Sequence, residues 1–154
     1  MQELDRYDKR ILTLLQADGR MSNQDLADAI GLSPSPCLRR VKALEEAGLI
    51  TGYRALVDAK KLGYSLMALI YISMDQHTPE RFASFEGAIE AIPEVQECLL
   101  ITGQQADYQL KVIVADMDGY QNLLLNKITR IKGVTGVHTS FVLRRVVDKT
   151  QVPV

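Results

Sequence analysis

The stretch SNQDLADAIGLSPSPCLRRVKALEEAG, residues 22–48, decides the fold of the first third of the chain. Gly31 divides it into two helical segments, because glycine readily takes the left-handed conformation that closes a helix. The first segment is short, and the second begins at Ser33. Pro34 and Pro36 fall in the first turn of this second helix, where their missing N–H groups have no helical partner to lose. The stretch therefore predicts two helices joined by a tight turn.

A further helix precedes this pair. Asp5 is expected to cap it, apolar residues recur at helical spacing as far as Ala17, and Gly19 ends it. Ser22 followed by Asp25 has the spacing of a capping box at the start of the next helix. Three helices in this order, with a glycine turn between the second and the third, are typical of a helix-turn-helix module that binds DNA.

The third helix is expected to have an inner apolar face and an outer cationic face. Residues 1–57 are electrically balanced overall, but three cations and no acid lie between Asp28 and Glu45. A cationic helix face is often only solvated surface, so this prediction of DNA binding depends on the helix order and the double proline as well. Arg40 would be lost as a contact if it paired with Glu45 or Glu46. The expected inner residues are Leu38, Val41 and Leu44; Ser35, Arg39, Lys42 and Glu46 follow the outer face. The expected DNA contacts are Ser33, Ser35, Pro36, Arg39, Arg40 and Lys42, with the arginines able to reach guanine edges in the major groove.

Strand-like residues follow this helix from position 49 to position 57. They extend the predicted DNA-binding domain to residues 1–57, a winged helix-turn-helix. The polar segment 58–63 shows no clear period and is predicted to be a hinge. Residues 64–154 then form a second domain, so the fold class is α+β.

The second domain consists of two similar halves, each with a strand, a helix and a strand. This order predicts a ferredoxin-like βαββαβ fold. Such a fold leaves one sheet face open, and burial of that face against a second subunit is the natural outcome. The expected strands are residues 65–74 (covered on both faces), 95–102, 108–114 and 134–147. The expected helices begin at Thr78–Pro79, with Phe82, Phe85, Ile89 and Ile92 inward, and at Asp116 or Asp118, with Tyr120, Leu124, Ile128 and Ile131 inward.

Several function classes are not expected. Cys37 and Cys98 lie far apart with no metal-ligand spacing around either, so neither a metal site nor a disulfide framework is predicted. No cofactor is expected. The longest apolar run, residues 66–72, is too short for a bilayer, and the charged N-terminus does not resemble a signal peptide, so a cytoplasmic protein without membrane contact is expected. His77 and His138 have no recognisable nucleophile beside them, so no enzyme is predicted.

The quoted residues resemble the leucine-responsive regulatory protein/AsnC (Lrp/AsnC) family of transcriptional regulators, over essentially the whole chain. The resemblance implies homodimers that assemble further, commonly into octamers, bind double-stranded DNA and respond to an amino acid. The matching segments are Leu4-Asp-Arg-Tyr-Asp, Ile11-Leu, Asp18-Gly-Arg, Asp25-Leu-Ala, Gly31-Leu-Ser-Pro-Ser-Pro-Cys-Leu-Arg-Arg-Val, Leu44-Glu-Glu-Ala-Gly-Leu-Ile and Thr102-Gly…Asp107-Tyr.

The same resemblance implies that the amino acid binds between dimers. Gly103 would let backbone N–H groups approach its carboxylate, and Asp107 would pair with its ammonium group. The loop from Thr102 to Asp107 is longer than the family's usual one, and a simple strand connection is the alternative interpretation of these residues. A regulatory module that acts on a partner protein is the alternative to DNA binding. The implied effector contacts are Thr102, Gly103, Asp107, Tyr108, Thr139 and Ser140.

Overall fold

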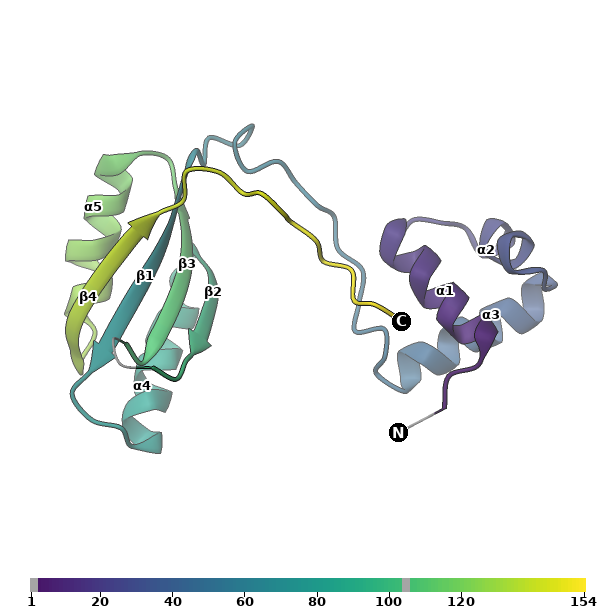
Figure 1. Cartoon of the computed structure of the whole chain (residues 1–154), viewed down its shortest axis with the longest axis horizontal. Coiled ribbons are helices and arrows are strands. Elements are labelled where there is room, and N and C mark those ends of the chain that lie inside the picture. The colour runs from purple at the N-terminus through teal and green to yellow at the C-terminus, as the bar shows by residue number, and fades with distance from the viewer. Residues whose placement is uncertain (1–2, 104–105) are drawn as a thin grey trace. The chain divides into compact units, whose positions relative to one another are not determined.

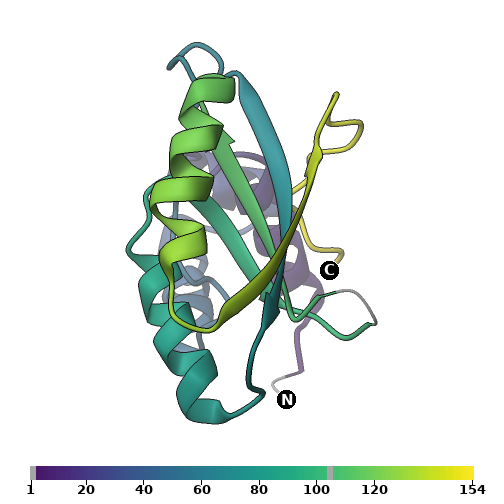
Figure 2. The same cartoon turned by 90° about the vertical axis from the view of Figure 1, so that its left-hand side faces the viewer.

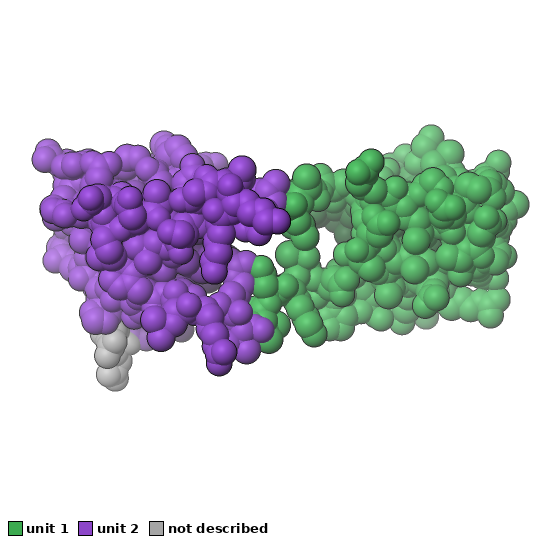
Figure 3. Space-filling model, turned by 90° about the horizontal axis from the view of Figure 1, so that it is seen from above, with its two compact units in different colours: residues 1–56, 147–154 green, residues 57–146 purple. Residues whose placement is uncertain are grey.

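The computed structural model describes residues 3–103 and 106–154. The chain forms two compact units: Met1–Leu56 together with Val147–Val154, and Val57–Val146 (Figure 3). Within the described residues, no helix combines the length and the apolar character that crossing a membrane requires.

The first unit contains three helices, α1 (Arg6–Ala17), α2 (Asn23–Ile30) and α3 (Pro34–Glu46) (Figure 1). Asp5 caps α1 in a reciprocal capping box with Asp8. At the start of α2, the Ser22 hydroxyl oxygen accepts from the Asp25 N–H at 3.1 Å. Gly31 ends α2 with φ 72°, the left-handed value that glycine tolerates. The predicted order and starts of the helices are confirmed.

The core of this unit corrects one predicted face of α3. Its inner stripe consists of Cys37, Val41 and Leu44, spaced by four and three residues, whereas Leu38 is 44% exposed. Successive helical residues are separated by about 100°, so a stripe that passes through position 37 leaves position 38 on the outer side. The prediction that Leu38 faces inward is therefore wrong, and Cys37 takes the core position.

The strand expected over residues 49–57 does not form. Ile50 packs against the core of the helical unit, and residues 51–57 are exposed backbone without regular structure. A strand needs the edge of another strand to satisfy its N–H and C=O groups. The described part of this unit contains only helices as regular elements, so it offers no such edge.

The second unit contains a sheet and two helices. Its strand order is β2-β3-β1-β4 and every neighbouring pair is antiparallel, which confirms the predicted βαββαβ fold. Figure 2 shows α4 and α5 on the same side of the sheet. The elements are β1 (Leu66–Met74), α4 (Pro79–Glu90), β2 (Val95–Leu100), β3 (Tyr108–Val114), α5 (Met117–Asn126), a 3-10 turn (Ile128–Arg130) and β4 (Val134–Phe141).

The two faces of β1 differ in burial. Alternate residues, among them Ile70 and Ile72, are fully buried beneath the helices. The residues between them, Met67, Leu69 and Tyr71, are half-buried on the opposite face. The prediction that this strand is covered on both faces is therefore wrong for a single chain, because both helices lie on one face. An apolar stripe remains on the other.

Two predicted elements are too long. The last strand ends at Phe141 rather than at position 147, and Leu143 is 99% exposed. β4 runs antiparallel to β1, so the end of β4 lies beside the start of β1 at Leu66. The Val142 N–H donates to the Met67 carbonyl at 2.9 Å, and beyond this point β1 offers no further residues for pairing. The second helix of this unit ends at Asn126, and Leu123 rather than Leu124 is its fully buried leucine.

The C-terminal residues contact α1, which the sequence did not predict. The Gln16 side-chain amide donates to the Val152 carbonyl at 3.0 Å. The Val152 N–H donates back to Gln16 Oε1 at 2.7 Å. This pair of hydrogen bonds imitates a strand pairing and attaches Val147–Val154 to the helical unit.

Candidate DNA interface and effector site

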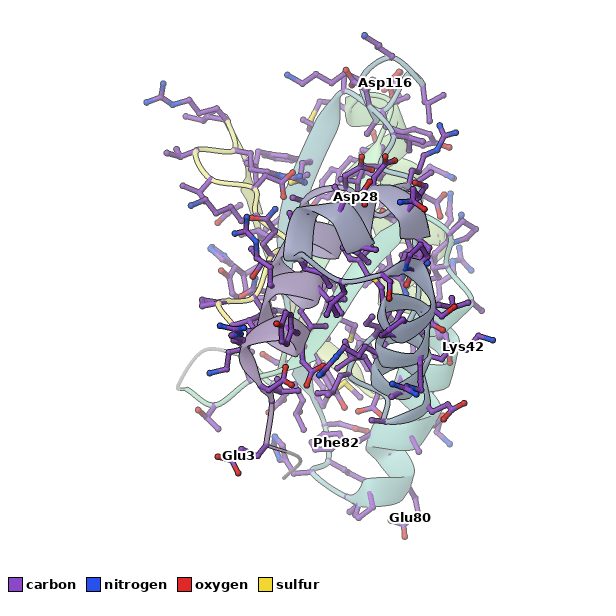
Figure 4. All side chains as sticks on the ribbon, turned by 90° about the vertical axis from the view of Figure 1, so that its right-hand side faces the viewer. Glu3, Asp28, Lys42, Glu80, Phe82 and Asp116 are labelled. Atoms are coloured by element: carbon purple, nitrogen blue, oxygen red, sulfur yellow. The ribbon has the colours of Figure 1, made fainter. Side chains whose placement is uncertain are left out.

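The outer face of α3 carries a shallow groove. Ser35, Arg39, Lys42 and Glu46, which the sequence placed on one face, all line it. Leu38 and Ala43 complete the lining. The sequence prediction missed Leu38 because it assigned that residue to the core, and it did not include Ala43. Figure 4 shows Lys42 on the outer side of its helix. The groove combines two cations and one carboxylate with two apolar side chains, so its net positive charge suits contacts to phosphates and to base edges.

The N-terminus of α3 leaves donors available. Ser33 is the N-cap residue, yet its side chain makes no capping hydrogen bond. Asn23 Nδ2 donates to the Pro34 carbonyl at 2.9 Å and so fixes the start of α3 against α2. The first N–H groups of a helix have no helical acceptor and carry a partial positive charge. This terminus can therefore receive a phosphate, and Asn23, which the sequence analysis missed, positions it.

Arg40 is held by the first helix. Its guanidinium lies 2.9 Å from Asp5 Oδ2 and 2.8 Å from Asp8 Oδ1, and 5.2 Å from the centre of the Tyr7 ring. The partner is thus α1 and not the glutamates at positions 45 and 46. The pKa of Asp5 lies below its usual value, chiefly because the Asp8 N–H donates to it, with smaller contributions from Tyr7 and Arg40.

The neighbouring Arg39 differs. It is exposed, and it forms no ion pair with any described residue. Of the two arginines, Arg39 therefore has the guanidinium that is free to contact another molecule. Burial raises the pKa of the Cys37 thiol beneath them, which suits a core residue and not a reactive one.

Asp107 connects the ends of two strands of the second unit. Its Oδ2 accepts the Met74 N–H at 2.7 Å, and its Oδ1 lies 2.7 Å from His77 Nε2. Its own N–H donates to the Ile72 carbonyl at 2.8 Å, and its carbonyl accepts the Ile101 N–H at 2.8 Å. The carboxylate is therefore fixed in position at the end of the β2–β3 hairpin.

Tyr108 points into the core instead of into the hairpin loop. The residue is 1% exposed, and its hydroxyl donates to Glu86 Oε1 on α4 at 2.7 Å. Its ring contacts those of Phe82 and Phe85. Burial and the Glu86 carboxylate raise the pKa of the phenol well above its ordinary value. Tyr108 thus anchors β3 to α4.

The remaining predicted effector residues lie in two places. Thr102 and Gly103 are exposed in the hairpin, where Gly103 has φ 152° and open space in place of a Cβ atom. Thr139 Oγ1 accepts the Tyr120 hydroxyl at 2.6 Å beneath α5, and Ser140 is exposed. Neighbouring strand residues point to opposite faces, so these last two diverge. One chain therefore assembles the hairpin residues but does not add Thr139 and Ser140 to them. Gln104 and Gln105, in the longer loop, lie outside the described residues.

The comparison with protein families finds two matches that together span most of the chain. Residues 4–51 match a family model described as winged helix-turn-helix DNA-binding. Residues 67–152 match the Lrp/AsnC ligand binding domain. The leucine-responsive regulatory proteins of Salmonella typhimurium and of Escherichia coli are 42% identical over 144 residues, covering 94% of this chain and 87% of theirs.

Solved structures agree with these matches. A transcriptional regulator from Neisseria meningitidis, crystallised in complex with L-Met, is 35% identical with a TM-score of 0.93. The alignment covers 98% of this chain and 97% of that one. Escherichia coli AsnC is 31% identical with a TM-score of 0.88, over 97% of this chain and 98% of its own.

Proposed function

We propose that this chain, which belongs to the Lrp/AsnC family of transcriptional regulators, contacts DNA with the outer face of α3 and binds an amino acid at its β2–β3 hairpin. The chain is a DNA-binding regulator with an amino-acid-sensing domain. The observation that carries the residue-level proposal is the exposed cationic groove of α3 beside a helix N-terminus with an unused cap hydroxyl. We propose that the protein acts in the cytoplasm and catalyses no reaction.

The proposed DNA contacts divide by chemistry. Arg39 reads a base, because its guanidinium is free and an arginine fits the two acceptors of guanine. Lys42 contacts phosphate as a point charge. Ser33, Ser35 and Pro36 bring the N-terminus of α3 to a phosphate. Arg40 contributes a phosphate contact only if it shares its guanidinium with the carboxylates of α1.

Salt titration of DNA binding tests this division. Fluorescence anisotropy would use DNA duplexes from the region upstream of the protein's own gene. It would compare wild type with Lys42→Ala and with the control Lys60→Ala, which changes a lysine of the segment 58–63. We expect Lys42→Ala to weaken binding to all sequences and to reduce the salt slope by about one, as for one lost phosphate contact. An unchanged slope in Lys42→Ala would place the DNA on another surface.

The effector proposal follows from the hairpin. Gly103 allows close approach of a carboxylate to backbone N–H groups, and Asp107 offers a carboxylate to an ammonium group. Thr102 adds a hydroxyl, and Tyr108, which follows Asp107, anchors the start of β3 to α4 without a contact of its own to the ligand. Because Thr139 and Ser140 do not join these residues within a chain, we propose that they belong to the site through a neighbouring subunit. A solved relative that holds L-Met supports an amino acid as the ligand.

A thermal-shift screen of the twenty amino acids tests the effector site. A ligand that binds only the folded protein raises its melting temperature by mass action. We expect at least one amino acid to do so for wild type and for Asp118→Asn, an exposed control on α5, but not for Asp107→Asn. Equal stabilisation of all three proteins would remove Asp107 from the site.

The proposed assembly is a homodimer built on the open sheet face, with dimers joining into larger rings such as octamers. Effector binding between dimers would then change the spacing and the angle between the α3 helices of two subunits, which are the helices proposed to enter the DNA groove. We expect coupling of about 1–3 kcal/mol between effector and DNA, equal in both directions by linkage. If saturating DNA leaves the amino-acid affinity unchanged, the two sites are not coupled.

A further inference from the structure

The two oxygens of Asp107 have different partners. Oδ2 is bound by a main-chain group, the N–H of Met74 at the end of β1. Oδ1 is bound by a side chain, the imidazole of His77, which is 65% exposed in the segment between β1 and α4. The main-chain bond is part of the fold, whereas an exposed side chain can turn away into water. One of the two positions on the carboxylate is therefore exchangeable.

The occupant of that position has the chemistry of the proposed ligand. His77 Nε2 lies 2.7 Å from Asp107 Oδ1, a distance typical of a strong N–H···O hydrogen bond. An ammonium group binds a carboxylate through the same kind of N–H donor. An exposed His–Asp pair contributes little to stability, so a competing donor can replace it.

We propose that His77 occupies the place of the effector's ammonium group in the free protein and is displaced when an amino acid binds. This inference rests on the proposed role of Asp107 in the effector site. His77 is then a positioning residue that controls access to Asp107, and it contributes no contact to the bound state.

His77 lies against the start of α4, so its displacement would affect that helix. Its ring meets Phe82 edge-on, with centroids 5.9 Å apart, and Phe82 meets Tyr108 edge-on at 5.5 Å. Thr78, the next residue, caps α4 by accepting the Arg81 N–H at 3.2 Å. Figure 4 labels Glu80 and Phe82 on the first turn of this helix. Release of His77 therefore removes a contact from the start of α4, and the effector acts on that helix as well as on the hairpin.

The experiment measures L-methionine and L-leucine binding to the full chain by calorimetry. The proteins are wild type, His77→Ala, His138→Ala and Asp107→Asn; His138, on β4, is the control histidine. If His77 occupies most of the Asp107 sites, its removal raises the apparent affinity by about 3- to 10-fold, the inverse of the fraction left competent. We expect this gain in His77→Ala and none in His138→Ala.

A spectroscopic signal separates displacement from a merely structural role. With histidine labelled, we expect the ring signals of His77 to move on saturation with L-methionine toward those of an exposed imidazole. Equal or weaker binding by His77→Ala, or an unmoved His77 signal, overturns this inference while the effector site stands. Binding retained by Asp107→Asn, or no binding of either amino acid by wild type and His77→Ala, overturns the proposed site and this inference with it.

Discussion

Two adjacent arginines of α3 differ in what holds them. Arg39 is exposed without an ion pair among the described residues, and Arg40 is bound between two carboxylates of α1. We expect Arg39→Ala to weaken operator binding by about 1–3 kcal/mol and to relax specificity at one base pair. We expect Arg40→Ala to lower the melting temperature of the helical unit, because Asp5 and Asp8 lose their cation. Anisotropy and thermal unfolding measure the two effects.

This division has a clear contrary outcome. If Arg40→Ala relaxed specificity while Arg39→Ala bound like wild type, the groove along Ser35, Arg39 and Lys42 would not be the base-reading surface. The ion pairs of Arg40 with Asp5 and Asp8 would then have to break when the protein binds DNA.

The charge at Asp5 predicts an acid dependence. Its pKa is lowered by the Asp8 N–H and, less strongly, by Tyr7 and Arg40. A carboxyl whose pKa is lowered in the folded state stabilises the fold at pH values above its ordinary pKa of 3.8. This contribution is lost as the pH falls through the pKa that the carboxyl has in the folded state. Asp5→Asn keeps an N-cap acceptor but not the charge. We expect its stability deficit at pH 7 to shrink as the pH falls from the ordinary value through the folded-state pKa of Asp5; a deficit independent of pH would show that the charge is irrelevant.

Tyr108 tests whether a predicted effector residue acts directly. Its hydroxyl is bound to Glu86 inside the second unit. We expect Tyr108→Phe to lower the free energy of unfolding by about 0.5–1.5 kcal/mol, as for one lost hydrogen bond, and to leave amino-acid affinity unchanged. Tyr64→Phe, at an exposed position, is the control. Lost affinity with unchanged stability would instead make the hydroxyl a ligand contact.

At the scale of elements, alanine substitutions at two separate glycines, Gly133 and Gly87, distinguish the cost of backbone strain from the gain in helix propensity. Gly133 has φ 97°, and a Cβ there would lie 2.7 Å from Arg81 Cδ and 3.0 Å from Met74 Cε. Gly87 lies inside α4 with open space around its Cβ position. We expect Gly133→Ala to destabilise the unit by about 1–3 kcal/mol and Gly87→Ala to stabilise it by about 0.5–1 kcal/mol. Urea unfolding measures both, and equal effects of the same sign would contradict the argument.

The elements also show what a sequence can predict. Helix starts at Asp5 and Ser22 were predictable, and Asp116 was one of two candidate caps, because capping is decided by residues within one turn. The false strand at 49–57 and the overlong last strand were not, because a strand exists only where a partner edge exists. The inner face of α3 was misplaced by one residue, since Leu38 and Cys37 are both plausible core residues and only packing selects one.

At the scale of the whole molecule, the candidate sites were partly predictable. The outer face of α3 follows from a local period, so Ser35, Arg39, Lys42 and Glu46 were placed together correctly. The Arg40 interaction with α1 and the Gln16 contact with the C-terminal residues join positions far apart in sequence, and no local pattern contains them. The separation of Thr139 from the hairpin likewise depends on sheet register and on assembly.

The open sheet face gives the last prediction. Leu69 is half-buried on β1, opposite Lys111 and Ser140 on its neighbours, and points away from both helices. If this face joins two subunits, Leu69→Glu would place a further carboxylate in the interface, where the opposite Lys111 already pairs with Glu97, and burial of that charge would oppose association. We expect the variant to fold and to sediment as a single chain.

Its DNA affinity should fall sharply, because one recognition helix cannot address two half-sites about 34 Å apart. Leu125→Glu is the matched control: Leu125 is 50% exposed on α5, on the helical side of the sheet, so we expect the same dimer as wild type. A Leu69→Glu protein that remained dimeric would mean that this apolar stripe stays exposed to water and that the subunits associate through another surface. The spacing of the recognition helices would then have to be fixed by the helical units themselves, and Leu69→Glu would leave DNA binding intact.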